Sequence, residues 1–136
     1  MSYTSTQVKN RYNKKTYKNM MIRVPTGLGD VLREYIREKT KESIASYMRT
    51  AVEDFLAFHK GKIAVPDDFK PLNGIGYGDI FNIAIRKEEA ALFDEAVRVN
   101  GTTVNFLFLS AICEKMQREG ADVPHDLLAS CGKVDT

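Results

Sequence analysis

Apolar and polar residues alternate along residues 19–24, and this pattern predicts a half-buried β-strand. One face of the extended chain carries Met20, Ile22 and Val24. The opposite face carries Asn19, Met21 and Arg23. Pro25 has no N–H group to donate to a neighbouring strand, so we expect the strand to end there.

Two amphipathic helices are predicted after this strand, because apolar residues then recur at intervals of three and four. Thr26 offers a side-chain oxygen that can cap the first helix, and Ser43 can cap the second. The first apolar stripe is Leu28, Val31, Leu32, Tyr35 and Ile36. The second is Ile44, Tyr47, Met48, Ala51, Val52, Phe55 and Leu56. Residues 19–60 therefore read as a strand-helix-helix unit.

A similar pattern returns in residues 80–119, which we interpret as a tandem duplication of the first unit. Phe81, Ile83 and Ile85 take the places of the apolar residues of the first strand at an offset of 61 positions, and Thr103 can cap the last helix. Residues 61–79 are rich in Pro and Gly and read as a linker. Residues 120–136 read as a tail that docks through Leu127 and Leu128.

One strand and two short helices cannot close a core, so each unit needs a partner strand. The run Ile22-Arg23-Val24-Pro25 before an amphipathic helix resembles the ribbon-helix-helix family of DNA-binding proteins, the Arc and MetJ type. In that family two strands pair antiparallel, and the polar face of the ribbon enters the major groove. The resemblance implies a mainly α fold with a two-stranded antiparallel β-ribbon. Pairing within the chain would give a pseudo-dimer, and pairing of each unit with a second molecule is the alternative.

The outer face of such a ribbon supplies the candidate base-reading residues. Arg23 can hydrogen-bond guanine, an asparagine can read adenine, and small or flexible apolar side chains can contact thymine methyl groups. The candidates are Asn19, Met21, Arg23, Asn82 and Ala84. The two strands differ at these positions, so a single-chain ribbon would prefer a site without palindromic symmetry.

Charge is distributed unevenly along the chain and favours a polyanion partner for the first half. Residues 1–62 contain 13 Lys and Arg against 6 Asp and Glu, whereas residues 63–136 contain 7 against 12. We expect the N-terminal arm, residues 1–18, to contact phosphates through Lys9, Arg11, Lys14, Lys15 and Lys18. The family resemblance adds the starts of the two second helices, at Ser43, Ile44, Thr103 and Val104.

The last predicted helix carries a second apolar stripe, which suggests a protein interface. This stripe is Phe106, Leu109 and Cys113. An exposed apolar stripe needs a cover, and the linker, the tail or another protein could each supply one. Together with the acidic second unit, it favours an alternative role in binding another protein.

The residues indicate neither an enzyme nor a metalloprotein. No nucleophile-and-base set or phosphate-binding loop is recognisable, and Cys and His are spaced too widely for a zinc site. We expect no catalytic residue, no metal and no cofactor, and a cytoplasmic protein, because no apolar run has membrane-spanning length. The expected function is sequence-specific binding of double-stranded DNA as a transcriptional repressor or autoregulator. The alternative is a protein-binding role as an antitoxin, an accessory of conjugative DNA processing, or an inhibitor of a host nuclease encoded by a phage or mobile element; a homo-oligomer is compatible with both.

Overall fold

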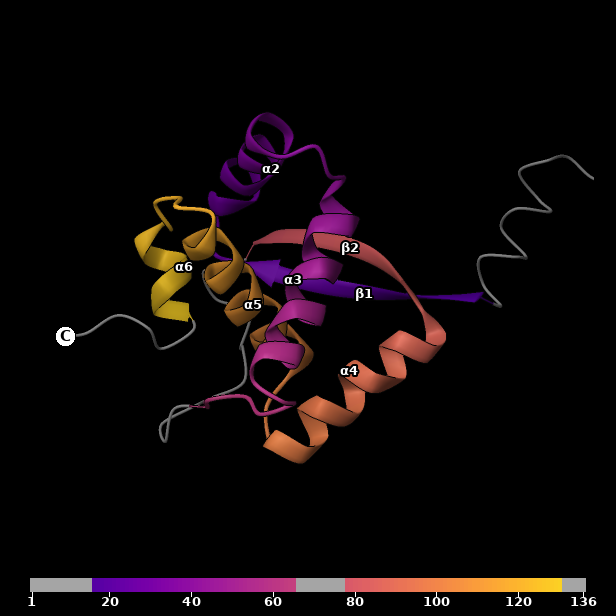
Figure 1. Ribbon diagram of the computed structural model, residues 1–136. Helices are drawn as coiled ribbons and strands as arrows, with labels where there is room; N and C mark the ends of the chain where they lie inside the picture. Colours follow the sequence, from indigo (N-terminus) through magenta and orange to yellow (C-terminus); the bar gives the residue numbers. More distant parts are fainter. Residues whose placement is uncertain (1–15, 66–77, 131–136) are drawn as a thin grey trace, which may run out of the picture.

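The two predicted strands pair with each other in one antiparallel sheet (Figure 1). In this computed structural model, which describes residues 16–65 and 78–130, β1 is Tyr17–Val24 and β2 is Asp79–Arg86. Tyr17 lies opposite Arg86, and Met21 lies opposite Asn82. The pairing is therefore intrachain, and the prediction of a mainly helical fold with a two-stranded antiparallel sheet is confirmed.

Two helices follow each strand in the chain, and a short helix comes last. The helices are α2 Leu28–Lys39, α3 Ile44–Phe58, α4 Lys87–Asn100, α5 Val104–Arg118 and α6 His125–Ser130. Figure 1 shows α4 leaving the end of β2, and α3 crossing the pair of strands. Helices α2, α3 and α4 contact β2, α5 contacts β1, and α6 contacts α5. All the helices described therefore pack, directly or through α5, on one two-stranded sheet.

The apolar face of the sheet forms the centre of a single core. Its six side chains are at most 4% exposed: Met20, Ile22, Val24, Phe81, Ile83 and Ile85. The packing is crosswise, because α3 contacts β2 whereas α5 contacts β1, and the two helices pack against each other. Burying side chains of this size stabilises the fold by roughly 1.5–3 kcal/mol each. Each half of the chain thus completes the core of the other.

The starts of three helices show which predicted caps are correct. Ser43 accepts a hydrogen bond from the N–H of Ser46, and Thr103 accepts one from Phe106, so both predicted caps are confirmed. The expected cap at Thr26 is wrong, because its hydroxyl accepts from the N–H of Gly78 instead.

Asp79, the first residue of β2, caps α2 from a distant part of the chain. Its Oδ2 accepts hydrogen bonds from the N–H groups of Gly27 at 2.8 Å and of Gly29 at 2.9 Å. Gly27 has φ +95°, a conformation that glycine adopts without strain. A Cβ on Gly29 would lie 2.9 Å from Asp79 side-chain atoms, so the cap requires glycine there.

The predicted tail contains a helix that packs on α5. Leu127 is fully buried and Leu128 is partly buried, so the expected docking of the tail through these residues is confirmed. The predicted linker also begins with packed residues. Ile63 is 7% exposed, and its N–H donates to the Oδ1 of Asn100 at 3.0 Å.

Candidate nucleic-acid interface

The outer face of the ribbon is the part of the sheet that the helices leave uncovered. From Met20 to Val24 on β1 and from Phe81 to Arg86 on β2, side chains alternate between the buried core and this face. Asn19, Asn82 and Ala84 are exposed, Met21 is 51% exposed, and Arg23 is partly buried. The sheet therefore brings the five predicted base-reading residues together on one face.

Asn19 and Asn82 contact each other across the ribbon. The Nδ2 of Asn19 donates to the Oδ1 of Asn82 at 3.2 Å. This bond leaves the carbonyl and one N–H of Asn19, and both N–H groups of the Asn82 amide, available for other partners. The pair therefore holds a defined set of donors and an acceptor near the middle of the face.

The main chain of Arg23 is held by a residue of the second half. The Oδ1 of Asn105 accepts from the N–H of Arg23 at 2.6 Å, and the Nδ2 of Asn105 donates to the carbonyl of Arg23 at 3.0 Å. Asn105 is the second residue of α5. The start of this helix is thus fixed directly to the strand that carries the arginine.

Two residues of the same face were missed in the sequence. Tyr17 and Arg86 lie opposite each other at the far end of the ribbon, and Arg86 is exposed. Extending the alternation of β2 by two positions beyond Ala84 would have identified Arg86. The face therefore carries an arginine near each end, Arg23 on β1 and Arg86 on β2.

The predicted phosphate contacts at helix starts lie at true helix N-termini. Ser43 and Thr103 are the N-cap residues, and Ile44 and Val104 are the first helical residues. The first N–H groups of a helix have no intrahelical acceptor and can bind an anion. Their role with DNA stays a prediction.

Only one of the basic residues predicted in the N-terminal arm is described, and it has an acidic partner. Lys18 lies on the same side of β1 as the core residues, and its Nζ is 3.0 Å from the Oδ2 of Asp94 on α4. Because both side chains of this ion pair are about half exposed, the pair does not test the expected contact of Lys18 with phosphate, which stays a prediction. Lys9, Arg11, Lys14 and Lys15 lie outside the described residues.

The second apolar stripe of α5 is internal, and its expected role as a protein interface is wrong. Phe106, Leu109 and Cys113 are 5%, 2% and 0% exposed. The Sγ of Cys113 donates to the carbonyl of Leu127 at 3.6 Å, which places the stripe against α6. Of the three covers considered for this stripe, the chain's own tail therefore supplies at least part.

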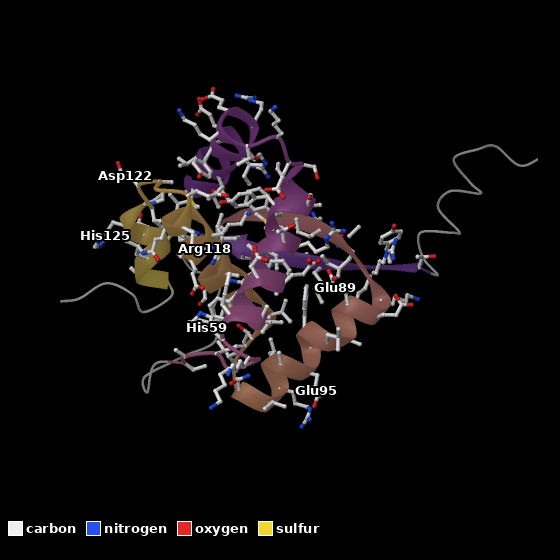
Figure 2. All side chains as sticks on the ribbon, viewed as in Figure 1. His59, Glu89, Glu95, Arg118, Asp122 and His125 are labelled. Atoms are coloured by element: carbon white, nitrogen blue, oxygen red, sulfur yellow. The ribbon has the colours of Figure 1, made fainter. Side chains whose placement is uncertain are left out.

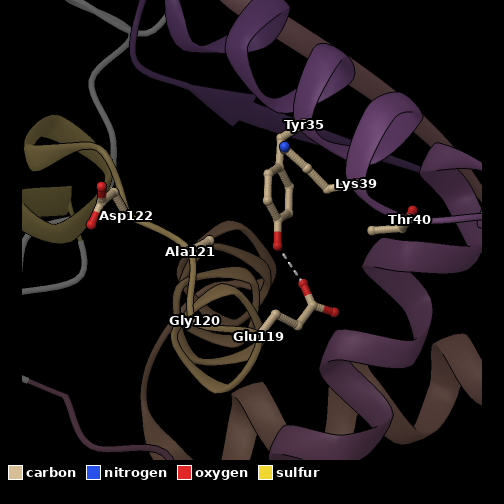
Figure 3. A pocket seen from close by; sticks show the side chains of 7 residues that line it. All are labelled: Tyr35, Lys39, Thr40, Glu119, Gly120, Ala121 and Asp122. Carbon is tan, nitrogen blue, oxygen red and sulfur yellow. Dashed lines mark hydrogen bonds between the residues drawn. The ribbon is translucent and has the colours of Figure 1, made fainter.

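The partly exposed carboxylate of Glu119, at the end of α5, joins three helices. Tyr35 of α2 donates to the Oε1 of Glu119 at 2.7 Å (Figure 3). Tyr47 of α3 donates to the same oxygen at 2.8 Å. Burial disfavours the charged carboxylate, but these two hydrogen bonds and Lys115 outweigh it and hold the pKa of Glu119 below its ordinary value. Burial and the same carboxylate raise the pKa of Tyr35 to about 12. An open pocket of about 540 Å³ lies beside this cluster, between α2 and the end of α5.

Glu89 is a second perturbed carboxyl group, on the side of α4 that faces α3 (Figure 2). Burial, followed by the nearby carboxylate of Glu53, raises the pKa of Glu89, while Arg49 and Arg86 act in the opposite direction. The Oε1 of Glu89 is buried without a hydrogen-bond partner among the described residues. This geometry belongs to the packing of α4 and not to the ribbon face.

Other kinds of site find little support in the described parts of the chain. Within residues 16–65 and 78–130, no three His, Cys, Asp or Glu side chains are grouped so that they could hold a metal ion. No single helix in those ranges is long and apolar enough to cross a membrane; α4 and α5 taken together pass that test but are bent by 99° where they meet. Comparisons with protein-family models, with curated proteins and with solved structures found no match.

Proposed function

We propose that this chain binds double-stranded DNA sequence-specifically by inserting its β-ribbon into the major groove, and that it acts as a transcriptional repressor or autoregulator. The observation that carries the proposal is the uncovered outer face of an isolated two-stranded ribbon. Asn19, Met21, Asn82 and Ala84 are exposed there beside Arg23. A ribbon that only stabilised a core would need no such set of hydrogen-bonding side chains on its open side.

The dimensions of the ribbon suit the major groove. Two paired strands lie about 4.8 Å apart, and the groove is about 12 Å wide and admits a two-stranded ribbon. Strands of eight residues extend for about 26 Å, which matches seven or eight base pairs at about 3.4 Å each. On this scale Arg23 reads a guanine, the asparagine pair reads adenine, and Met21 and Ala84 contact thymine methyl groups.

The arrangement of the two halves supports a tandem ribbon-helix-helix architecture. The inner-face residues Met20, Ile22 and Val24 recur as Phe81, Ile83 and Ile85, and both second helices begin with a hydroxyl cap. The crosswise contacts of α3 with β2 and of α5 with β1 are those of two interlocked copies. We therefore interpret the chain as a single-chain pseudo-dimer.

The two halves differ in charge and in their outer faces, so the proposed operator is not palindromic. Arg23 of β1 has Ala84 as its counterpart in β2, and Asn19 has Ile80. The net charge is +7 in residues 1–62 and −5 in residues 63–136. The half of the operator that lies under Arg23 should consequently carry more of the sequence discrimination.

One observation favours the alternative role in protein binding. Leu92 and Val99 of α4 are 68% and 66% exposed and lie seven residues apart, which places them on one face of the helix. Glu88 and Glu95 accompany them on the acidic half. A protein partner of the second half would occupy this face of α4 rather than the buried stripe of α5.

Selection of bound fragments from random double-stranded DNA at near-physiological salt tests the proposal. We expect a short, non-palindromic motif, and Arg23→Ala should reduce discrimination at one guanine by about 1–3 kcal/mol. Arg37→Ala is the matched control, because it removes the same charge from an exposed position on α2. Binding that is blind to sequence, or an unchanged motif for Arg23→Ala, would refute the ribbon as the reading element.

A further inference from the structure

The contact between Asn105 and Arg23 ties the start of α5 to the main chain of β1. The amide of Asn105 pairs with both main-chain groups of one residue, through bonds of 2.6 and 3.0 Å. Because the N–H of Arg23 points to Asn105, it points away from β2, where Ile80 is its cross-strand neighbour. Asn105 therefore occupies the open edge of β1, as a further strand would.

This contact lies where the strand is weakest. Arg23 is the residue before last in β1, and Pro25 follows directly after the strand. A strand end without a neighbour on its open edge frays readily, and fraying would move the Cα of Arg23. The two bonds from Asn105 oppose that motion at the one outer-face residue of β1 that carries a guanidinium.

The other half of the ribbon lacks both members of the pair. The second residue of α3 is Ala45, where α5 has Asn105, and the counterpart of Arg23 is Ala84. Alanine has no side-chain donor or acceptor with which to bind a strand edge. The amide lock is thus present only beside the arginine.

We infer that Asn105 is a positioning residue for DNA readout: it fixes Arg23 for base contact and couples it to the phosphate-binding start of α5. The inference rests on the function proposed above. Thr103 and Val104 begin α5, so a phosphate held there is only one or two residues along the chain from Asn105, whose amide holds Arg23. Docking of the helix start on the DNA backbone then sets how far the guanidinium of Arg23 reaches into the groove toward the base edge. Because the main chain of Arg23 is already held, the arginine loses less conformational entropy on binding.

A double-mutant cycle of Asn105→Ala and Arg23→Ala tests this role. The quantity measured is the ratio of affinities for the selected operator and for the operator with the guanine under Arg23 replaced. Loss of two hydrogen bonds should lower this ratio about tenfold in the wild-type background. In the Arg23→Ala background, Asn105→Ala should change the ratio no further, because it acts only through the arginine.

Three further measurements separate positioning from a general structural effect. Affinity for unrelated DNA should stay within about twofold, since Asn105 touches no base or phosphate in this role. Amide hydrogen exchange at Arg23 should accelerate in Asn105→Ala while exchange in β2 stays unchanged. If Asn105→Ala does not fold, Asn105→Asp takes its place, because it keeps an acceptor for the N–H of Arg23. Asn105→Asp should lower the ratio of affinities less than Asn105→Ala, and it should not lower the ratio in the Arg23→Ala background.

The outcomes that overturn the inference are distinct from those that overturn the proposed function. A ratio that falls equally in both backgrounds, or a fall in affinity for all DNA with the ratio unchanged, would show that Asn105 acts independently of Arg23. If wild-type protein has no preferred operator, or if Arg23→Ala leaves the ratio unchanged, the proposed function itself fails, and the inference with it. Unaltered exchange at Arg23 in Asn105→Ala would also refute the lock.

Discussion

The capping of α2 by Asp79 gives the sharpest test of how the two halves hold each other. Asp79 is the first residue of β2, and its Oδ2 accepts from the N–H groups of Gly27 and Gly29. The start of one helix is thereby tied to a strand about 50 residues later in the chain. We consider Asp79→Ala, which removes both hydrogen bonds and the negative charge.

The magnitude follows from two separate contributions. Removing a side-chain cap costs about 0.5–2 kcal/mol, and losing a negative charge at a helix N-terminus costs about 0.3–1 kcal/mol. The side chain is partly exposed, which reduces the second contribution. Asp79→Ala should therefore lower the free energy of unfolding by about 1–2.5 kcal/mol. Asp79→Asn retains an acceptor oxygen and should lose only about 0.5–1 kcal/mol.

Urea denaturation followed by far-ultraviolet circular dichroism measures these differences, with Asp94→Ala as the control. Asp94 is also acidic and also links the two halves, through an ion pair with Lys18 in which both side chains are about half exposed. Exposed pairs of this kind contribute about 0–1 kcal/mol. If Asp79→Ala proves no more destabilising than Asp94→Ala, the bonds to Gly27 and Gly29 do not cap α2 in solution.

Three other substitutions probe separate parts of the chain. Glu89→Gln should stabilise the protein at neutral pH, because the fold raises the pKa of Glu89 and so disfavours its charged form. The stability that the neutral carboxyl group contributes is present at low pH and is lost as pH rises from 4.5 through the raised pKa. Urea denaturation midpoints measured across this pH range should therefore fall less in the variant than in the wild type. Leu127→Ala should cost about 2–5 kcal/mol in urea denaturation, and Leu128→Ala clearly less, since only the first is fully buried; equal losses would refute α6 as the cover of α5. Arg86→Ala should relax base preference about six base pairs from the position read by Arg23, as measured by fragment selection, and an unchanged motif would exclude Arg86 from the reading face.

The inner face of the fold could be predicted because its signals are local. Alternation of apolar residues identified all six core positions of the ribbon, from Met20 to Ile85. The caps at Ser43 and Thr103 were also visible, because each hydroxyl lies three residues before the N–H that it accepts from. Such contacts depend only on the conformation of one short segment.

Contacts between distant segments could not be predicted in the same way. Thr26 was the expected cap of α2 because it lies beside the helix, whereas the carboxylate that performs the role belongs to Asp79. The stripe at Phe106 was expected to need a cover, but the pattern of α5 does not show which of the linker, the tail or another protein supplies it; the structure shows that α6 packs there. Asn105 gave no signal, since a single polar residue in the first turn of a helix is ordinary.

The contrast between the two faces of the ribbon explains how one chain can hold two different halves. An inner-face substitution changes the core that both halves share, so corresponding positions such as Met20 and Phe81 are both apolar and buried, although the two side chains differ in shape. An outer-face substitution leaves that core unaltered and costs little stability. The corresponding outer-face residues Arg23 of β1 and Ala84 of β2 are an example of such a difference. The outer face can therefore differ between the strands in polarity and charge. Under the proposed function, both strands enter the groove as parts of one chain, so their outer faces evolve as a single DNA-binding surface. The half that carries Arg23 can then provide most of the sequence discrimination, while β2 provides the strand that pairs with β1.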